Sequence, residues 1–122
     1  PPTTPETVNL INRQTLAQMK PGAVLVNTAR GAVVDADALC EALDRGQLFG
    51  AALDVFKIEP LPTTSPLLKY DSVVLCTHMG GMDHDSAIAT SSLAAQCIVD
   101  LYHGRWPEAC AVNRELRERW KW

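Results

Sequence analysis

The stretch Ala23-Val24-Leu25-Val26-Asn27-Thr28-Ala29-Arg30-Gly31 decides the fold. Its first four residues form a short apolar run of aliphatic side chains, and the run follows the turn signal Pro21-Gly22. Such a run predicts a strand that is buried on both faces of a parallel sheet. The polar residues that follow it, ending with Arg30, then lie at the carboxyl end of this strand.

Two further strands are predicted downstream. Asp35 is a good N-cap for a helix that Gly46 can close, and apolar strands follow at residues 50–56 and 73–76. A strand, a helix and a strand with short joints favour a right-handed parallel crossover. The sequence therefore predicts an α/β fold with a parallel sheet of about three strands and flanking helices.

The remaining segments are assigned from periodicity and turn residues. Residues 12–19 form a short helix, and residues 57–72, which contain three prolines, form a long ordered loop. Apolar residues recur at helical spacing from Ile88 to Tyr102, which predicts one long amphipathic helix that ends at Gly104. A short terminal helix is expected at residues 114–120, and Trp106, Trp120 and Trp122 are expected to pack this tail onto a neighbouring domain.

Composition excludes several classes of partner. A net charge of −3 and a pI near 5.5 give no basic surface for nucleic acid or for anionic lipid. No apolar run is long enough to span a bilayer, so we expect no membrane partner and a small-molecule one instead. Cys40, Cys76, Cys97 and Cys110 lack metal-site spacing, so we expect no metal and read them as free thiols in a reducing cytoplasm.

Polar side chains follow all three predicted strands. Arg30 follows the first strand, Asp54 and then Glu59 follow the second, and His78 follows the third. Ligands of open parallel sheets bind beyond the carboxyl ends of the strands. Each of these residues taken singly is most often a plain surface or loop residue, but their convergence predicts a site.

These residues stand in motifs that resemble the D-2-hydroxyacid dehydrogenase family. The run from Met19 to Gly31 with Asp35 resembles its "MKPGAxLVNxARG…VD" motif, and the likeness spans residues 1 to about 105. Further matches follow in order: Gly50-Ala51-Ala52-Leu53-Asp54-Val55-Phe56, Glu59-Pro60, Pro66-Leu67-Leu68 and Thr77-His78-Met79-Gly80-Gly81. The resemblance implies a partial Rossmann-like sheet and NAD(P)-dependent oxidoreductase chemistry.

The resemblance also implies three catalytic roles. Arg30 matches the arginine that anchors the carboxylate and keto group of a 2-oxoacid substrate. His78 matches the histidine that gives a proton to the keto oxygen or takes it from the hydroxyl. Glu59 matches the glutamate that accepts a hydrogen bond from this histidine and favours its protonated form.

Other matched residues imply contacts with NAD or NADP, of which NAD is favoured. Asp54 matches the aspartate that bonds the nicotinamide carboxamide. Backbone groups near the same ring carry over to Thr28, Ala29, Gly80 and Gly81. Pro2 and Thr4 match a loop that borders the adenosine and ribose.

The sequence lacks the GxGxxG turn that holds the cofactor's pyrophosphate. Residues 1–83 are therefore expected to be the second half of an NAD(P)-binding Rossmann domain. Residues 84–122 are expected to be a long return helix and a tail of the substrate domain. Exposed sheet surfaces would then favour a homo-oligomer.

Two alternatives to the dehydrogenase remain open at this stage. Some relatives are non-catalytic, NAD-sensing corepressors that keep much of the fold and bind partner proteins. The chain also begins with Pro1-Pro2 and lacks an initiator Met, which suggests an excised or truncated fragment without activity. Because the pyrophosphate-binding turn and most of the substrate domain are missing, the chain alone is expected to bind NAD(H) weakly and to turn over little or no substrate.

Overall fold

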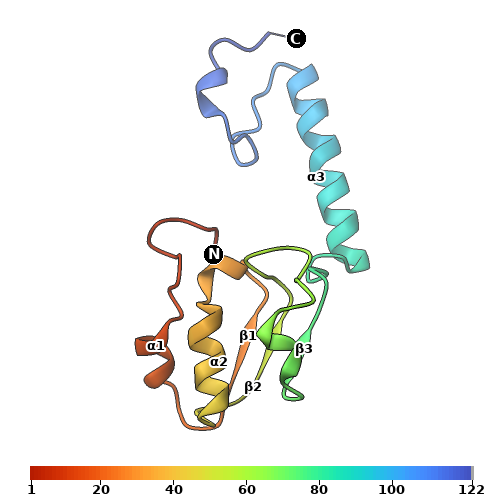
Figure 1. The fold of residues 1–122 in the computed structure, drawn as a ribbon. Coiled ribbons are helices and arrows are strands. Elements are labelled where there is room, and N and C mark those ends of the chain that lie inside the picture. Colours follow the sequence, from red (N-terminus) through yellow and green to blue (C-terminus); the bar gives the residue numbers. More distant parts are fainter. Residues whose placement is uncertain (122) are drawn as a thin grey trace. The chain divides into compact units, whose positions relative to one another are not determined.

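The computed structural model of the protein describes residues 1–121, in two compact units, Pro1–Gly80 and Gly81–Trp122 (Figure 1). The first unit contains a parallel sheet with the strand order β1-β2-β3. Its strands are β1 (Ala23–Asn27), β2 (Leu48–Leu53) and β3 (Val73–Leu75). The predicted α/β class and three-stranded parallel sheet are confirmed, with strand ends shifted by up to three residues.

The crossover between β1 and β2 contains the predicted helix. Helix α2 (Ala36–Asp44) begins after Asp35, whose side chain accepts hydrogen bonds from the backbone N–H groups of Asp37 and Ala38, each at 3.1 Å. These bonds satisfy donors that the first turn of a helix leaves unpaired. The chain leaves the helix through Gly46, whose φ of 66° lies in the left-handed region that glycine adopts readily.

The N-terminal segment is attached to the turn that follows β1. Helix α1 (Arg13–Ala17) is capped by Asn12, within the predicted range of residues 12–19. The backbone N–H groups of Asn9 and Ile11 donate to the carbonyls of Ala32 and Val33, at 2.9 and 3.0 Å. Residues near the N-terminus therefore lie beside the 3₁₀ turn η1 (Gly31–Val33), which directly follows Arg30.

The core lies on one face of the sheet. Leu25 of β1 and Leu53 of β2 belong to the same buried cluster as Leu16 of α1 and Leu39 of α2, and the last two are at most 1% exposed. Burying each leucine contributes roughly 1.5–3 kcal/mol. Both helices of the first unit therefore cover this face. Their packing against the sheet helps to hold the ends of the strands in register.

The opposite face of the sheet is uncovered in the described chain. Val24, Val26 and Val74 point away from the core and are 55%, 64% and 60% exposed. The register pairs Val26 with Ala52 and Ala52 with Val74, so the apolar surface runs across all three strands. The prediction that β1 is buried on both faces is wrong here, because α1 and α2 pack on the other side.

Two irregular segments also differ from prediction. The loop at residues 57–72 contains a 3₁₀ turn, η2 (Pro66–Lys69), whose first turn is capped by the Ser65 side chain. The helix predicted at residues 114–120 is only the 3₁₀ turn η3 (Arg114–Leu116). Proline spacing and charge patterns indicate loops and helices but carry little information about single 3₁₀ turns.

The second unit contains the predicted long helix. Helix α3 (His84–Tyr102) begins after Asp83, which accepts from the Ser86 N–H at 2.9 Å. None of its described residues is buried, and most of its apolar side chains, such as those of Ile88, Leu93 and Ile98, are exposed. Trp106 and Trp120 pack edge to face with ring centroids 6.4 Å apart, whereas Trp122 lies outside the described residues. Within residues 1–121, no helix is both long enough and apolar enough to cross a membrane.

The uncovered sheet face leads to a prediction about association. We expect the chain to self-associate with rising concentration, because water contact with this apolar surface is unfavourable. Val26→Lys should lower the apparent mass, measured by light scattering. Val112→Lys, at a position that is 92% exposed in the second unit, is the matched control and should leave the mass unchanged. A monomeric wild type at high concentration would contradict the prediction.

Candidate active site

The turn after β1 is held by a buried asparagine. The Asn27 side chain is 6% exposed; its Oδ1 accepts from the Ala29 N–H and its Nδ2 donates to the Arg30 carbonyl, both at 3.1 Å. These bonds fix the backbone that presents Arg30. The guanidinium of Arg30 is exposed and donates from Nη1 to the Ala29 carbonyl at 2.7 Å. The sequence analysis did not single out Asn27. A polar residue two positions after Leu25, on the same face of the strand, could have indicated it.

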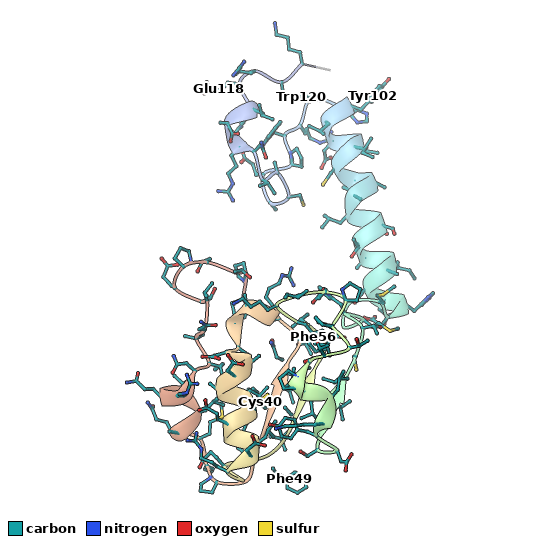
Figure 2. The ribbon with its side chains drawn as sticks, viewed as in Figure 1. Cys40, Phe49, Phe56, Tyr102, Glu118 and Trp120 are labelled. Atoms are coloured by element: carbon teal, nitrogen blue, oxygen red, sulfur yellow. The ribbon has the colours of Figure 1, made fainter. Side chains whose placement is uncertain are left out.

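Gly31 brings this turn against the loop that follows β2. A Cβ atom at position 31 would lie 1.9 Å from the carbonyl carbon of Phe56, a distance at which one backbone would have to move. Only glycine allows this approach. Figure 2 shows Phe56 beside the ends of the strands. The close contact places Arg30 next to the segment that carries Glu59.

Glu59 and His78 form a hydrogen-bonded pair. Oε2 of Glu59 lies 2.9 Å from Nδ1 of His78, while Oε1 accepts from the Phe56 N–H at 2.8 Å. The Phe56 N–H, and next the His78 side chain, lower the pKa of Glu59, so its carboxylate is ionised at neutral pH. An ionised carboxylate requires N–H at Nδ1, which leaves Nε2 of His78 available to a ligand.

The backbone of His78 is held in an uncommon conformation. Its φ of 62° lies in the left-handed region that non-glycine residues seldom adopt. Asp54, at the end of β2, accepts the next two backbone N–H groups: Met79 bonds Oδ1 at 2.8 Å and Gly80 bonds Oδ2 at 2.7 Å. The Met79 N–H is the largest cause of the lowered pKa of Asp54. The Asp54 carboxylate and the Glu59 pair together fix the orientation of His78.

Arg30, Glu59 and His78 line one hollow of about 280 Å³, which we call the polar hollow. Thr3, Phe56 and Lys57 also line it. The structure therefore brings together the three residues that the sequence placed at separate strand ends. The hollow contains a permanently charged donor group and a carboxylate-bound imidazole, which suits a small anionic molecule with a group that exchanges a proton.

An apolar hollow adjoins the same pair. It has a volume of about 720 Å³ and shares Phe56, Glu59 and His78 with the polar hollow. Its remaining wall is largely aliphatic and includes Leu61, Leu68 and Leu75. The imidazole of His78 therefore stands between a polar and an apolar surface.

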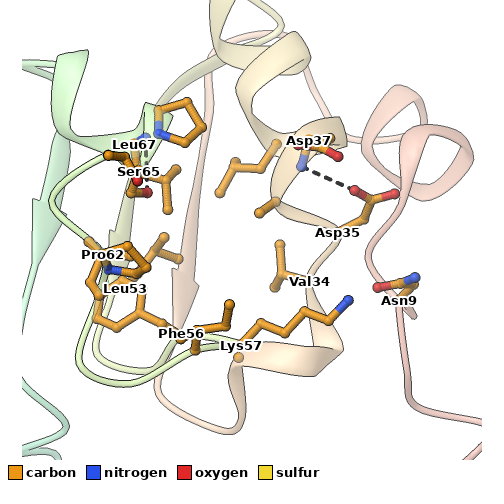
Figure 3. A pocket seen from close by; sticks show the side chains of 17 residues that line it. Asn9, Val34, Asp35, Asp37, Leu53, Phe56, Lys57, Pro62, Ser65 and Leu67 are labelled. Atoms are coloured by element: carbon orange, nitrogen blue, oxygen red, sulfur yellow. Dashed lines mark hydrogen bonds between the residues drawn. The ribbon is translucent and has the colours of Figure 1, made fainter.

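A third hollow, of about 550 Å³, lies between the start of α2 and the loop at residues 57–67 (Figure 3). Asp35 and Asp37 lie at one side, with the bond from the Asp37 N–H to the Asp35 carboxylate drawn, and Leu53 and Pro62 lie opposite. None of Arg30, Glu59 and His78 lines it. Its carboxylates are occupied or solvated, so its chemistry is less suited to a reaction.

Most of the residues predicted to contact the cofactor lie in the first unit. Thr28, Asp54 and Gly80 adjoin, because a Cβ at Gly80 would lie 2.8 Å from Asp54 Oδ2 and 3.9 Å from the Thr28 Cβ. Together with Ala29 they offer backbone and carboxylate groups at the rim of the sheet, which fits the polar amide of a nicotinamide. Gly81 belongs to the second unit.

The N-terminal loop is held by hydrogen bonds between its own residues. Thr4 bonds Thr7: the Thr4 N–H donates to Thr7 Oγ1 at 2.7 Å, and Thr7 Oγ1 donates to the Pro2 carbonyl at 2.8 Å. Thr3, which the sequence did not single out, is the threonine that lines the polar hollow. The predicted contacts of Pro2 and Thr4 with a nucleoside stay predictions.

Comparison with known families identifies the family of the chain. The family model described as "D-isomer specific 2-hydroxyacid dehydrogenase, NAD binding domain" matches residues 1–80. The chain belongs to this family. The matched range contains β1, β2 and β3 and every side chain of the polar hollow. The resemblance inferred from the sequence motifs is confirmed.

Curated relatives cover nearly the whole chain. The glyoxylate reductase of Thermofilum pendens is 46% identical over 115 residues, which are 94% of this chain and 34% of that protein. The glyoxylate/hydroxypyruvate reductase B of Pectobacterium carotovorum is 47% identical over 116 residues, or 95% and 36%. The chain thus spans about a third of the length of the curated relatives that it matches.

Solved structures of relatives share the fold. The TT0316 protein of Thermus thermophilus superposes with a TM-score of 0.78 at 46% identity, covering 88% of this chain and 34% of that one. A D-isomer specific 2-hydroxyacid dehydrogenase of Xanthobacter autotrophicus, in complex with NADPH and MES, gives 0.75 at 39% identity, covering 86% and 43%. The partial Rossmann-like class is therefore confirmed.

The Asp54 carboxylate leads to a prediction about pH. Because its pKa is lowered in the folded chain, its contribution to stability is present above the unfolded pKa, near 3.8, and is lost as pH falls through the folded value. Asp54→Asn should lower the Tm at pH 7 by several degrees and flatten the decline below about pH 4. Differential scanning calorimetry from pH 7 to pH 2.5 measures both effects.

The matched control is Asp71→Asn, which replaces an exposed aspartate of the same unit. This variant should keep the wild-type Tm at pH 7 and the wild-type acid profile. Hydrogen exchange of the Met79 and Gly80 amides should accelerate in Asp54→Asn alone. Equal melting profiles for both variants would show that Asp54 does not hold the His78 loop.

Proposed function

We propose that this chain carries the catalytic part of an NAD(P)-dependent dehydrogenase that interconverts a 2-oxoacid and a D-2-hydroxyacid. The observation that carries the proposal is the Glu59–His78 hydrogen bond of 2.9 Å in the hollow that Arg30 also lines. In this assignment Arg30, Glu59 and His78 are the catalytic residues. Membership of the dehydrogenase family supports it.

Arg30 is suited to hold the substrate by its carboxylate and keto group. Its guanidinium is planar and permanently charged, and it presents several N–H donors in a fixed arrangement. In the present structure one of these donors is bonded to the Ala29 carbonyl. The others remain to bind and orient an anion, which lowers the barrier by fixing C2 of the substrate beside His78.

His78 is suited to move the proton. During reduction the protonated imidazole donates from Nε2 to the keto oxygen, and during oxidation the neutral Nε2 accepts the hydroxyl proton. Glu59 bonds Nδ1 throughout, so the ring keeps one orientation and presents Nε2 to the substrate. Asp54 acts as a positioning residue through the Met79 and Gly80 amides.

The cofactor in this proposal is NAD or NADP, with NAD favoured by the family description. When bound, the reduced nicotinamide supplies the hydride that adds to C2 of the substrate. Thr28, Ala29, Asp54 and Gly80 would hold the ring end of the cofactor, and we extend this assignment to Gly81. The relative from Xanthobacter autotrophicus in complex with NADPH supports the use of such a dinucleotide.

The substrate class we propose is a small 2-oxoacid such as glyoxylate or hydroxypyruvate. Relatives that are 46% and 47% identical bear the names glyoxylate reductase and glyoxylate/hydroxypyruvate reductase B. A polar hollow of about 280 Å³ is in keeping with a small anionic substrate. The small molecule, rather than nucleic acid or a membrane, is the partner that this surface suits.

A chimera tests the assignment. Residues 1–122 replace the matching segment of the Thermofilum pendens relative, and reduction of glyoxylate by NADH or NADPH is followed by the loss of nicotinamide absorbance. The chimera should be active, and His78→Gln should lower kcat by about 10²–10⁴-fold because the proton donor is lost. Arg30→Gln should raise KM and lower kcat, since both binding and orientation depend on the guanidinium.

His103→Gln is the matched control in the chimera. This histidine is the C-cap of α3 and bonds the Val99 carbonyl, so its loss should leave kcat unchanged. Circular dichroism and cofactor fluorescence confirm folding of each variant. Turnover by His78→Gln equal to that of the parent chimera would reject the assignment of the proton donor.

The chain by itself gives a second prediction. The sequence contains no GxGxxG turn for the pyrophosphate, so we expect weak binding of NADH and little or no turnover of glyoxylate. Fluorescence titration with NADH and an absorbance assay measure the two quantities. Tight NADH binding with robust oxidation by glyoxylate or hydroxypyruvate would overturn this expectation.

A further inference from the structure

The tail that follows α3 folds back at the end of that helix. Gly104 has a φ of 72°, which allows the chain to reverse. Arg105 then bonds Asp100 twice: its backbone N–H donates to the Asp100 carbonyl at 2.8 Å, and its Nη2 donates to Oδ1 at 2.7 Å. These bonds fix the point at which the tail leaves the helix, and so they fix the position of Trp106.

The last turn of the tail returns to Trp106. The Leu116 carbonyl, in η3, accepts from the N–H groups of Arg119 and Trp120, at 3.0 and 2.7 Å. The rings of Trp106 and Trp120 then pack edge to face, with centroids 6.4 Å apart. The start and the end of the tail are therefore held together by their indoles.

These segments border a hollow of about 390 Å³ within the second unit, which we call the tail hollow. Its walls include three aromatic and two basic side chains: Tyr102, Trp106, Trp120, Arg117 and Lys121. Within residues 1–121, no carboxylate side chain lines it. The tail hollow therefore combines an aromatic surface with positive charge.

One wall of the tail hollow contains a hydrogen-bond donor that lacks an acceptor. Nε1 of Trp106 is buried and bonds no acceptor in the part of the chain that the structure describes. A buried donor without an acceptor is unfavourable, and native structures contain few of them. An acceptor atom from a bound ligand would remove this penalty.

The two cations of the tail hollow differ in what they already bind. Arg117 donates from Nη1 to the carboxylate of Glu108, so part of its charge is compensated. Lys121 takes part in none of the ion pairs of residues 1–121. The ammonium of Lys121 and the remaining N–H groups of Arg117 therefore suit an anionic ligand.

We propose that the tail hollow binds a small aromatic carboxylate. The carboxylate of the ligand pairs with Lys121 and Arg117 and accepts from Nε1 of Trp106, while its ring packs against the indoles. An inorganic anion would leave the aromatic wall unused, and a neutral ring would leave the cations unused. This site lies in the second unit and does not depend on the proposed dehydrogenase function.

Titration of the isotope-labelled whole chain with benzoate, followed by NMR, tests the proposal. The three tryptophans, at positions 106, 120 and 122, all belong to the second unit, so their indole N–H signals report on this unit alone. We expect a saturable downfield shift of the Trp106 signal, which is identified as the one missing from Trp106→Phe. Acetate, which lacks the ring, and benzamide, which lacks the charge, should each bind about tenfold more weakly.

Variants separate the contributions of charge and donor. Lys121→Gln should weaken benzoate binding roughly two- to fivefold, because an exposed charge pair is lost. Trp106→Phe keeps an aromatic ring without the donor and should weaken binding about fivefold, measured at the remaining indole signals. Arg119→Gln is the matched control, because this arginine does not line the tail hollow, and it should bind benzoate as the wild type does.

Arg30→Gln separates the tail hollow from the polar hollow, which Arg30 lines in the first unit. This variant should keep the full benzoate shift of the Trp106 signal, and circular dichroism confirms folding of each variant. No saturable shift of that signal, binding of acetate or benzamide equal to that of benzoate, loss of the shift in Arg30→Gln, or equal effects of Lys121→Gln and Arg119→Gln would each overturn the proposal.

Discussion

The candidate site depends on the carboxylate of Asp54 at the end of β2. By accepting the N–H groups of Met79 and Gly80, it joins the loop after β3 to the neighbouring strand. An ionised acceptor with two N–H donors is stronger than a neutral hydrogen bond, and here it is almost removed from water. Together with the bond from the Glu59 side chain, this contact holds His78 in its left-handed conformation.

Other side chains near the ends of the strands also bond the backbone of neighbouring loops. Two strands end at a residue whose side chain bonds a nearby backbone: Asn27 is the last residue of β1, and Asp54 directly follows β2. Glu59, in the loop after β2, accepts from the Phe56 N–H in the same way. Parallel strands bring these ends to one edge, and Gly31 removes the side chain that would keep two loops apart. Hydrogen bonds from side chains to the backbone therefore fix the loops that carry Arg30 and His78.

Much of this arrangement could be predicted from the sequence. The strands, the Asp35 cap and the Gly46 turn follow from local rules of apolar runs and capping, and the strand ends point to Arg30, Glu59 and His78. The uncovered face of β1 could not be predicted. The sequence pattern shows that Val24 and Val26 are apolar, but it does not show whether another element covers them. Thr3 was missed for a similar reason: its position depends on hydrogen bonds between the N-terminal segment and η1.

The left-handed backbone at position 78 constrains which residues the chain can accept there. Glycine and asparagine adopt this region at little cost, whereas β-branched residues meet the largest steric penalty. Substitution of His78 by valine or isoleucine would therefore remove the imidazole and also distort the backbone. An asparagine at that place would remove the ring while keeping the main-chain path, which makes it the cleaner choice for trapping a bound ligand in an unreactive form.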